Sequence, residues 1–227
     1  MSIDVLVQPA DSPDDFAQIY HCISEAFGRQ IKDSIWIAMN SNWNSPEGQR
    51  EGASKLLEHW QSSAKNKEGH PNTVILKATL PDPQDGFKLK IVGAAIWSQA
   101  SFVDGYGDLA DGQPCWPRGF GSHREALREP DAKSDSPAMF TLDTCAVDPA
   151  FQRRGVARKL VEWGLEEAKR RGGLECTTEA SPMGRGLYER LGFGAEGAGE
   201  DLVYEVDEEF RNRDKPEILF MRTWAGQ

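Results

Sequence analysis

The residues with the clearest chemical signal form a short turn in the second half of the sequence: Gln152, Arg153, Arg154, Gly155, Val156 and Ala157. The turn follows a β-rich run and begins a segment with helical periodicity. The first N–H groups of a helix have no partner within the helix, and they lie at the positive end of its dipole. Gly155 lets an anion approach the backbone closely, Ala157 leaves room nearby, and the two arginines add positive charge. The turn therefore predicts an anion-binding site, and a diphosphate suits it best, since hydrogen bonds to a charged partner contribute roughly 1.5 to 3 kcal/mol each.

Four elements must position this turn. The sequence predicts a strand over 138–147, a helix from about 152 to 171, a strand over 174–180 and a helix from about 182 to 191. Side chains alternate along a strand, so Asp143, Cys145 and Val147 share one side of the first strand.

These motifs resemble those of a known family. The turn matches neither the G-x-x-x-x-G-K-[ST] nor the G-x-G-x-x-G phosphate loop. Instead, Val147-Asp148-Pro149 followed by Gln152-x-x-Gly155-x-Ala157 resembles the GNAT acyl-CoA motif, Q/R-x-x-G-x-G/A. At the right distance, Ser181-x-x-Gly184-x-x-Leu187-Tyr188-x-x-x-Gly192-Phe193 is similar to the family's N-x-x-A-x-x-L-Y-x-x-x-G-F. The resemblance is strong over residues 138–193, with Ser181 in place of Asn and Gly184 in place of Ala.

The resemblance implies a fold and an acyl donor. The fold is α/β (α+β), with a mixed, mostly antiparallel sheet of six to seven strands flanked by helices, in which strands four and five splay apart. The donor substrate is acetyl-CoA, its pantetheine arm lying between those strands, and no metal takes part. The residues then expected to bind the cofactor are Cys145, Ala146, Val147, Gln152, Arg153, Arg154, Gly155, Val156, Ala157, Ser181, Gly184 and Tyr188.

Catalysis needs a proton donor and a base. Tyr188 matches the family tyrosine that protonates the departing thiolate, although it could instead be a core aromatic. An alkyl amine with a pKa of ~10.4 is neutral in only about one molecule in 2,500 at pH 7, so it must be deprotonated or desolvated. Asp143 is the first candidate base and Glu179 the second; either could be a solvated charge at a strand end. His123 is a third, more consistent with a surface position.

Two further residues have alternative interpretations. Ser181 could be only the N-cap of a helix that has Pro182 at its first position. Cys145 could suggest a covalent acyl-enzyme route, but no histidine partner lies nearby in the sequence, and the family uses direct attack.

No internal repeat or linker divides the chain, so the sequence predicts a single domain over 1–227. We expect a first strand at 3–9, a helix carrying Phe16 to Phe27, a second helix at about 48–64, and an antiparallel hairpin of 73–80 and 89–98. Residues 99–137 lose periodicity and predict a long, lid-like insert. Two strands follow, in LVYEV and EILFMRTW. The candidates for the acceptor pocket, which could equally be core, are Trp36, Trp43, Phe102, Tyr106, Trp116 and Phe120.

Composition restricts the partners. The net charge is −10. Such a chain lacks the extended basic surface that general binding to nucleic acid or anionic membranes requires, while it could attract a cationic amine. The four cysteines are scattered, with no zinc-ligand spacing, and no signal peptide or membrane span is evident. We therefore expect a cytoplasmic protein, monomeric or homodimeric.

The predicted activity is transfer of an acetyl group from acetyl-CoA to a primary amine, by direct attack in a ternary complex. A small-molecule acceptor is favoured because a lid would obstruct an open peptide groove. Two alternatives remain open: an N-acetyltransferase acting on a protein or peptide, and a regulatory module that binds acyl-CoA and catalyses nothing.

Overall fold

The computed structural model describes residues 4–82, 85–86, 88–101, 103–109, 138–195 and 217–223. The chain divides into two compact units. The first unit comprises Met1–Ser63, Thr73–Trp97 and Asp143–Gly164; the second comprises Ala64–Asn72, Ser98–Leu142 and Leu165–Gln227. Hydrogen bonding orders the strands β1-β2-β3-β5-β6-β8-β7, with β4 beside β3.

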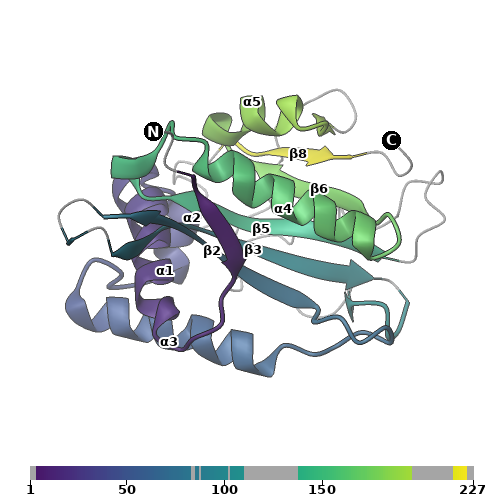
Figure 1. The fold of residues 1–227 in the computed structure, drawn as a ribbon, viewed down its shortest axis with the longest axis horizontal. Helices are drawn as coiled ribbons and strands as arrows, with labels where there is room; N and C mark the ends of the chain where they lie inside the picture. Colours follow the sequence, from purple (N-terminus) through teal and green to yellow (C-terminus); the bar gives the residue numbers. More distant parts are fainter. Residues whose placement is uncertain are drawn as a thin grey trace, which may run out of the picture. The chain divides into compact units, whose positions relative to one another are not determined.

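The first unit contains most of the N-terminal half. Its strands are β1 (Leu6–Pro9), β2 (Thr73–Pro81), most of β3 (Leu89–Ser101) and the end of β5 (Ala138–Val147). Its helices are α1 (Asp15–Ile23), the π-helix η1 (Ser24–Ile31), α2 (Ser34–Met39), α3 (Pro46–Ser62), the 3-10 helix η3 (Pro149–Phe151) and the start of α4 (Val156–Arg170). Figure 1 shows α1 and α3 side by side, and the rings of Phe16 and Trp60 join them at 5.3 Å.

Helix α4 packs closely on β3 because small residues stand at the contact. A Cβ on Gly164 would lie 2.1 Å from the ring of Trp97, and one on Gly93 would lie 2.8 Å from Val156. Trp97 and Leu160 are fully buried between these elements. The absence of a side chain at Gly93 and Gly164 therefore lets the helix approach the strand, and this fixes the position of the turn that precedes α4.

The second unit contains the start of β5, the end of α4, and β4 (Asp108–Leu109), β6 (Glu175–Ala180), α5 (Pro182–Arg190), β7 (Gly194–Ala195) and β8 (Leu219–Arg222). Strand β6 pairs antiparallel with β8, and α5 lies against both strands (Figure 1). The buried carboxylate of Glu175 accepts two hydrogen bonds of 2.6 Å from Arg222. Such a bidentate pair satisfies two charges that burial would otherwise penalise.

The pairing of β5 with β6 ends early. It is parallel and runs over four pairs, from Met139–Glu175 to Leu142–Thr178. Strand β5 then continues for five residues to Val147, while β6 continues to Ala180 alongside β8. This is the pattern that the predicted splay of these two strands requires, and the predicted fold class is confirmed.

Most predicted elements are present, with different ends. The strand over 138–147 is confirmed as β5, and the hairpin strands are neighbours in the sheet as β2 and β3. Two predictions are wrong: β3 extends to Ser101, three residues into the predicted insert, and α4 begins at Val156, four residues after Gln152. Helix α2 was not predicted. Residues 110–137 and the LVYEV strand lie outside the described residues, and the single domain stays a prediction.

Candidate functional site

The turn after β5 is held by Asp148. Its backbone N–H donates to the Val92 carbonyl at 2.9 Å, and its carboxylate accepts from the N–H of Ala150 at 2.9 Å. The side chain therefore caps η3 and fixes the exit of the chain from the strand. The Nζ atom of Lys90 lies 3.8 Å from the other carboxylate oxygen, so this buried charge has a cationic neighbour.

Gln152 ties the turn to two other segments. Its side-chain N–H donates to the carbonyl of Val147 at 3.1 Å and to Oε1 of Gln30 at 2.7 Å. Gln30, at the end of the π-helix η1, donates back to Oε1 of Gln152 at 3.1 Å. Sequence reasoning placed Gln152 on the diphosphate and missed Gln30, since the two residues are 122 positions apart. Here the Gln152 side chain holds the turn against β5 and η1, and its backbone leads directly into Arg153, Arg154 and Gly155.

Two residues of the turn have a backbone φ in the left-handed region. Arg153 has φ = +62° and Gly155 has φ = +81°, whereas Arg154 between them has no positive φ. Left-handed residues in a turn can direct successive N–H groups toward one side, and concavities of this kind bind anions. Arg153 adopts a conformation that is uncommon for a residue with a side chain, so the turn is held in this shape by its surroundings.

The first N–H groups of α4 have no acceptor in the part of the chain that the structure describes. The first helical hydrogen bond runs from the N–H of Lys159 to the carbonyl of Gly155 at 3.1 Å. This leaves the N–H groups of Val156, Ala157 and Arg158 available. A Cβ placed on Gly155 would meet no atom within 4 Å, so the space beside this backbone is open.

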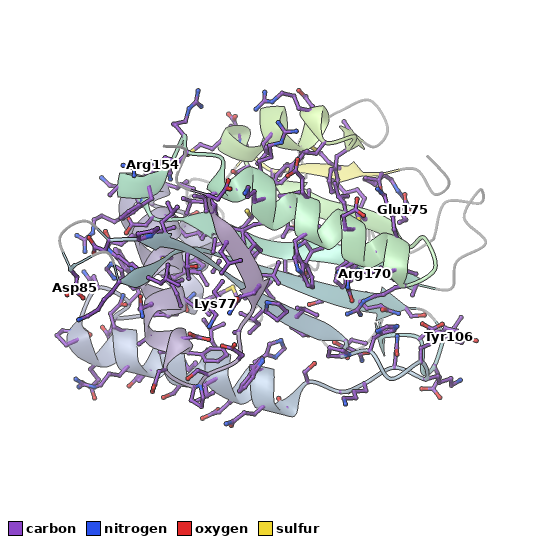
Figure 2. The ribbon with its side chains drawn as sticks, in the orientation of Figure 1. Lys77, Asp85, Tyr106, Arg154, Arg170 and Glu175 are labelled. Atoms are coloured by element: carbon purple, nitrogen blue, oxygen red, sulfur yellow. The ribbon has the colours of Figure 1, made fainter. Side chains whose placement is uncertain are left out.

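We call the backbone of residues 153–158 the cradle. Positive charge lies next to it. The side chains of Arg153 and Arg154 are exposed, and the Arg154 guanidinium stands 5.2 Å from the centre of the Phe151 ring. Figure 2 shows Arg154 at the turn that precedes α4. Lys90 approaches the same ring at 5.0 Å. The arginines can therefore neutralise an anion at the cradle without being consumed in ion pairs within the described residues.

The remaining predicted cofactor residues divide between the units. Ala146 and Val147 are buried and Cys145 is half-buried at the end of β5, in the first unit with the turn. Ser181 lies just before α5 and Gly184 lies within it, both in the second unit. Ser181 is the N-cap of α5 with Pro182 at its first turn, but its hydroxyl makes no capping hydrogen bond. The cap position is confirmed, and the side chain stays free for another role.

Tyr188 is buried, with 8% of its surface exposed. Its ring lies 5.7 Å from the ring of Phe193 at an angle of 58°. Its ring also lies close to Gly184, one helical turn earlier. The motif residues Gly184, Tyr188 and Phe193 are thus in one local cluster, which gives the tyrosine a defined position.

The two candidate bases differ in exposure. Asp143 is exposed on β5, immediately after the last residue that pairs with β6. Glu179 is half-buried on β6, opposite Phe220 of β8. Both lie where their strands have left the parallel ladder, Asp143 in the first unit and Glu179 in the second.

Two of the aromatic candidates for an acceptor pocket, Trp36 and Trp43, lie together. The rings of Trp36 and Trp43 meet edge to face at 5.8 Å, and Trp36 also lies 6.4 Å from Phe27 and 6.2 Å from Tyr20. Both tryptophans are half-buried. Tyr106 lies elsewhere, in the second unit. Three more pocket candidates, Phe102, Trp116 and Phe120, lie outside the described residues, and so does His123, the third candidate base.

The described residues contain neither a candidate metal site nor a helix that could span a membrane. No cluster of His, Cys, Asp or Glu there has an arrangement suited to a metal ion. Among the same residues, no helix combines the length and the apolar character needed to cross a bilayer.

Comparison with known proteins identifies relatives. Residues 109–193 match the family model described as "Acetyltransferase (GNAT) family". No curated protein sequence matches the chain. The chain is similar to a solved structure described as histone acetyltransferase HPA2 and related acetyltransferase from Corynebacterium glutamicum, with 21% identity, coverage of 100% of this chain and 98% of that chain, and a TM-score of 0.57.

Two further solved structures have the same fold. One is the PaiA N-acetyltransferase of Thermoplasma acidophilum in complex with coenzyme A, with 12% identity, 98% and 99% coverage and a TM-score of 0.53. The other is the ribosomal-protein-S18-alanine N-acetyltransferase of Escherichia coli, with 16% identity, 99% and 96% coverage and a TM-score of 0.51. Residues 109–193 of this chain therefore match the model of the acetyltransferase (GNAT) family, and the chain has the fold of these solved acetyltransferases.

Proposed function

We propose that this protein is an N-acetyltransferase that takes its acetyl group from acetyl-CoA and transfers it to a primary amine. The observation that carries the proposal is the cradle before α4, where the left-handed residues Arg153 and Gly155 precede three N–H groups that have no acceptor among the described residues. A diphosphate supplies the acceptors that these groups lack.

The cradle fits the diphosphate of a coenzyme A ester in charge and shape. The amides of Val156, Ala157 and Arg158 can each donate a charge-assisted hydrogen bond, with a contribution of roughly 1.5 to 3 kcal/mol per bond. Arg153 and Arg154 add two positive charges beside them. Gly155 leaves the backbone uncovered, so phosphate oxygens can reach it.

The acyl end of the donor would lie along the end of β5, with Cys145, Ala146 and Val147. The Val147 carbonyl already accepts from Gln152, which fixes this backbone before any ligand arrives. Acetyl-CoA supplies the activated acyl group, and the chain's own contribution is to orient it and to move protons.

Proton transfer requires one donor and one base. Tyr188 donates a proton to the departing thiolate, whose ordinary pKa of ~8.5 makes it a tolerable leaving group. Asp143 or Glu179 removes a proton from the amine, directly or through water, because an alkyl ammonium ion has no lone pair for attack. We favour Asp143, since it is exposed at the point where β5 leaves the ladder.

A small-molecule amine is the acceptor we favour. The net charge of −10 would draw a cationic amine toward the protein over short ranges. The solved relative from Escherichia coli is named for a protein substrate, so a peptide acceptor is the second candidate.

The test is a thiol-release screen with acetyl-CoA over polyamines, aminoglycosides, amino acids and N-terminal peptides. Release with a small amine and not with peptides supports the proposal; release with peptides alone overturns the acceptor class. If coenzyme A binds and no amine in the panel releases thiol, the regulatory alternative is favoured.

Tyr188→Phe tests the proton donor once an acceptor is known. Removing the hydroxyl should lower kcat by about 100-fold, the lower end for general acid catalysis, because the thiolate is already a fair leaving group. The KM for acetyl-CoA should change little. Unchanged turnover would remove Tyr188 from the mechanism.

A further inference from the structure

The ring of Tyr188 occupies space that the Cβ of any residue other than glycine at position 184 would fill. Gly184 lies four residues before Tyr188 on α5, and side chains at this spacing are neighbours on a helix. A Cβ on Gly184 would stand 2.6 Å from Cε2 of the tyrosine and 3.2 Å from its Cζ, which bears the hydroxyl. Ordinary carbon–carbon contacts are about 3.5 to 4.0 Å, so this Cβ and this ring position are incompatible.

The ring has packing on another side as well. Tyr188 is 8% exposed and contacts Phe193 with ring centres 5.7 Å apart. On a helix, a long side chain points back toward the N-terminus over the preceding turn, which directs the phenol past Gly184. Gly184 and Phe193 therefore both lie against the tyrosine ring, and the phenol's place is set by both.

We propose that Gly184 is a positioning residue for the phenol of Tyr188, an inference that rests on the proposed role of Tyr188 as proton donor. Where the family motif has alanine, this chain has glycine, and the tyrosine ring lies closer to the helix than an alanine would allow. The bare backbone at Gly184 thus defines where the proton is delivered.

The size of the effect follows from the distances. Restoring an ordinary contact of about 3.5 Å from the 2.6 Å separation moves the ring by roughly 1 Å. A displacement of this size at a reacting group costs up to about 100-fold in rate. Gly184→Ala should therefore lower kcat by about 10- to 100-fold, with the KM for acetyl-CoA nearly unchanged.

The same helix offers a matched control. Gly186 also lies within α5, but a Cβ there would meet only the Arg190 guanidinium, at an ordinary 3.5 Å. Both glycine-to-alanine changes raise helix propensity by about 1 kcal/mol, so a general effect on the helix would appear in both variants. Gly186→Ala should retain wild-type kcat.

A double-mutant comparison separates positioning from damage to the fold. In the Tyr188→Phe background no hydroxyl remains to misplace, so adding Gly184→Ala should cost almost nothing further. If Gly184→Ala lowers kcat by the same factor in both backgrounds, or has no effect in the wild type, the proposal is overturned.

Crystal structures of the wild type and of Gly184→Ala provide a readout that is independent of activity. The proposal expects the tyrosine ring to move by roughly 1 Å or to change rotamer. If the ring stays in place in Gly184→Ala, the proposal is overturned, whether or not the variant has lost activity. Full activity of Tyr188→Phe, by contrast, would reject the proposed proton donor, so the two failures are distinguishable.

Discussion

Replacing Gly155 by alanine probes the cradle with the smallest possible change. At φ = +81° an alanine adopts the left-handed conformation, which costs roughly 1 to 2 kcal/mol of folding free energy. The added Cβ itself meets no protein atom within 4 Å, so no steric clash adds to this cost. Folding should therefore be only modestly weakened.

The effect on ligand binding should be larger. The new methyl group points into the open space that the diphosphate is proposed to occupy, so at least one phosphate oxygen loses its backbone hydrogen bond. One charge-assisted hydrogen bond contributes about 1.5 to 3 kcal/mol, which corresponds to about a 10- to 150-fold increase in the Kd for coenzyme A.

Calorimetry with coenzyme A, together with thermal unfolding, measures both effects. Gly172→Ala is the matched control: Gly172 follows the other end of α4, has φ = +95°, and would also place its Cβ in open space. Both variants should lose similar stability, and only Gly155→Ala should lose affinity. Pantetheine, which lacks the diphosphate, should compete equally well for the wild type and for Gly155→Ala.

Two results would refute the reasoning. If Gly155→Ala binds coenzyme A as tightly as the wild type, the diphosphate lies elsewhere. If Gly172→Ala loses as much affinity, the effect is one of backbone strain and not of position.

Three further predictions concern the stability and packing of the fold. Arg222→Met leaves the Glu175 carboxylate buried without its cationic partner and should lower the free energy of unfolding by about 3 to 5 kcal/mol; denaturant titration checks this, and a loss below about 1 kcal/mol contradicts it. Burial, together with the charge of a nearby carboxylate, raises the pKa of the Cys22 thiol to about 12, so alkylating reagents should label it near pH 8 only after unfolding, as peptide mass spectrometry can show; labelling of the native protein at the rate of an exposed thiol would contradict this. The hydrogen bond from Lys77 lowers the pKa of Asp11 below its ordinary 3.8, so the contribution of this carboxylate to stability is present above that value and is lost as pH falls through the lowered pKa. Asp11→Asn should therefore lower Tm near pH 7, by an amount that shrinks as the pH falls below 3.8, and a constant difference in Tm would show that the charge plays no part.

Sequence patterns located the elements well where periodicity was strong. Strand β5 has the predicted ends because its apolar run is bounded by Asp148 and Pro149. Helix α4 begins later than predicted because helical periodicity does not register backbone handedness: Arg153 and Gly155 have positive φ, which excludes them from a right-handed helix. The predicted helix carrying Phe16 to Phe27 continues as the π-helix η1 to Ile31, and helix α2 directly precedes the Asn-, Ser- and Pro-rich stretch 40–46, which hides regular spacing there.

The site could be predicted as a set of residues but not as a set of contacts. The two motifs marked the cradle and the tyrosine, because these depend on local backbone geometry and on helix spacing. The Gln30–Gln152 amide pair joins residues 122 positions apart, and no local signal indicates it. The contact of Gly184 with Tyr188 depends on a side-chain rotamer, which the sequence alone leaves open.

The most direct test of the central claim is a crystal structure of the protein with coenzyme A bound. The account predicts phosphate oxygens within hydrogen-bonding distance of the backbone N–H groups of Val156, Ala157 and Arg158. Density for the diphosphate at another place, or no bound ligand at saturating coenzyme A, would contradict it.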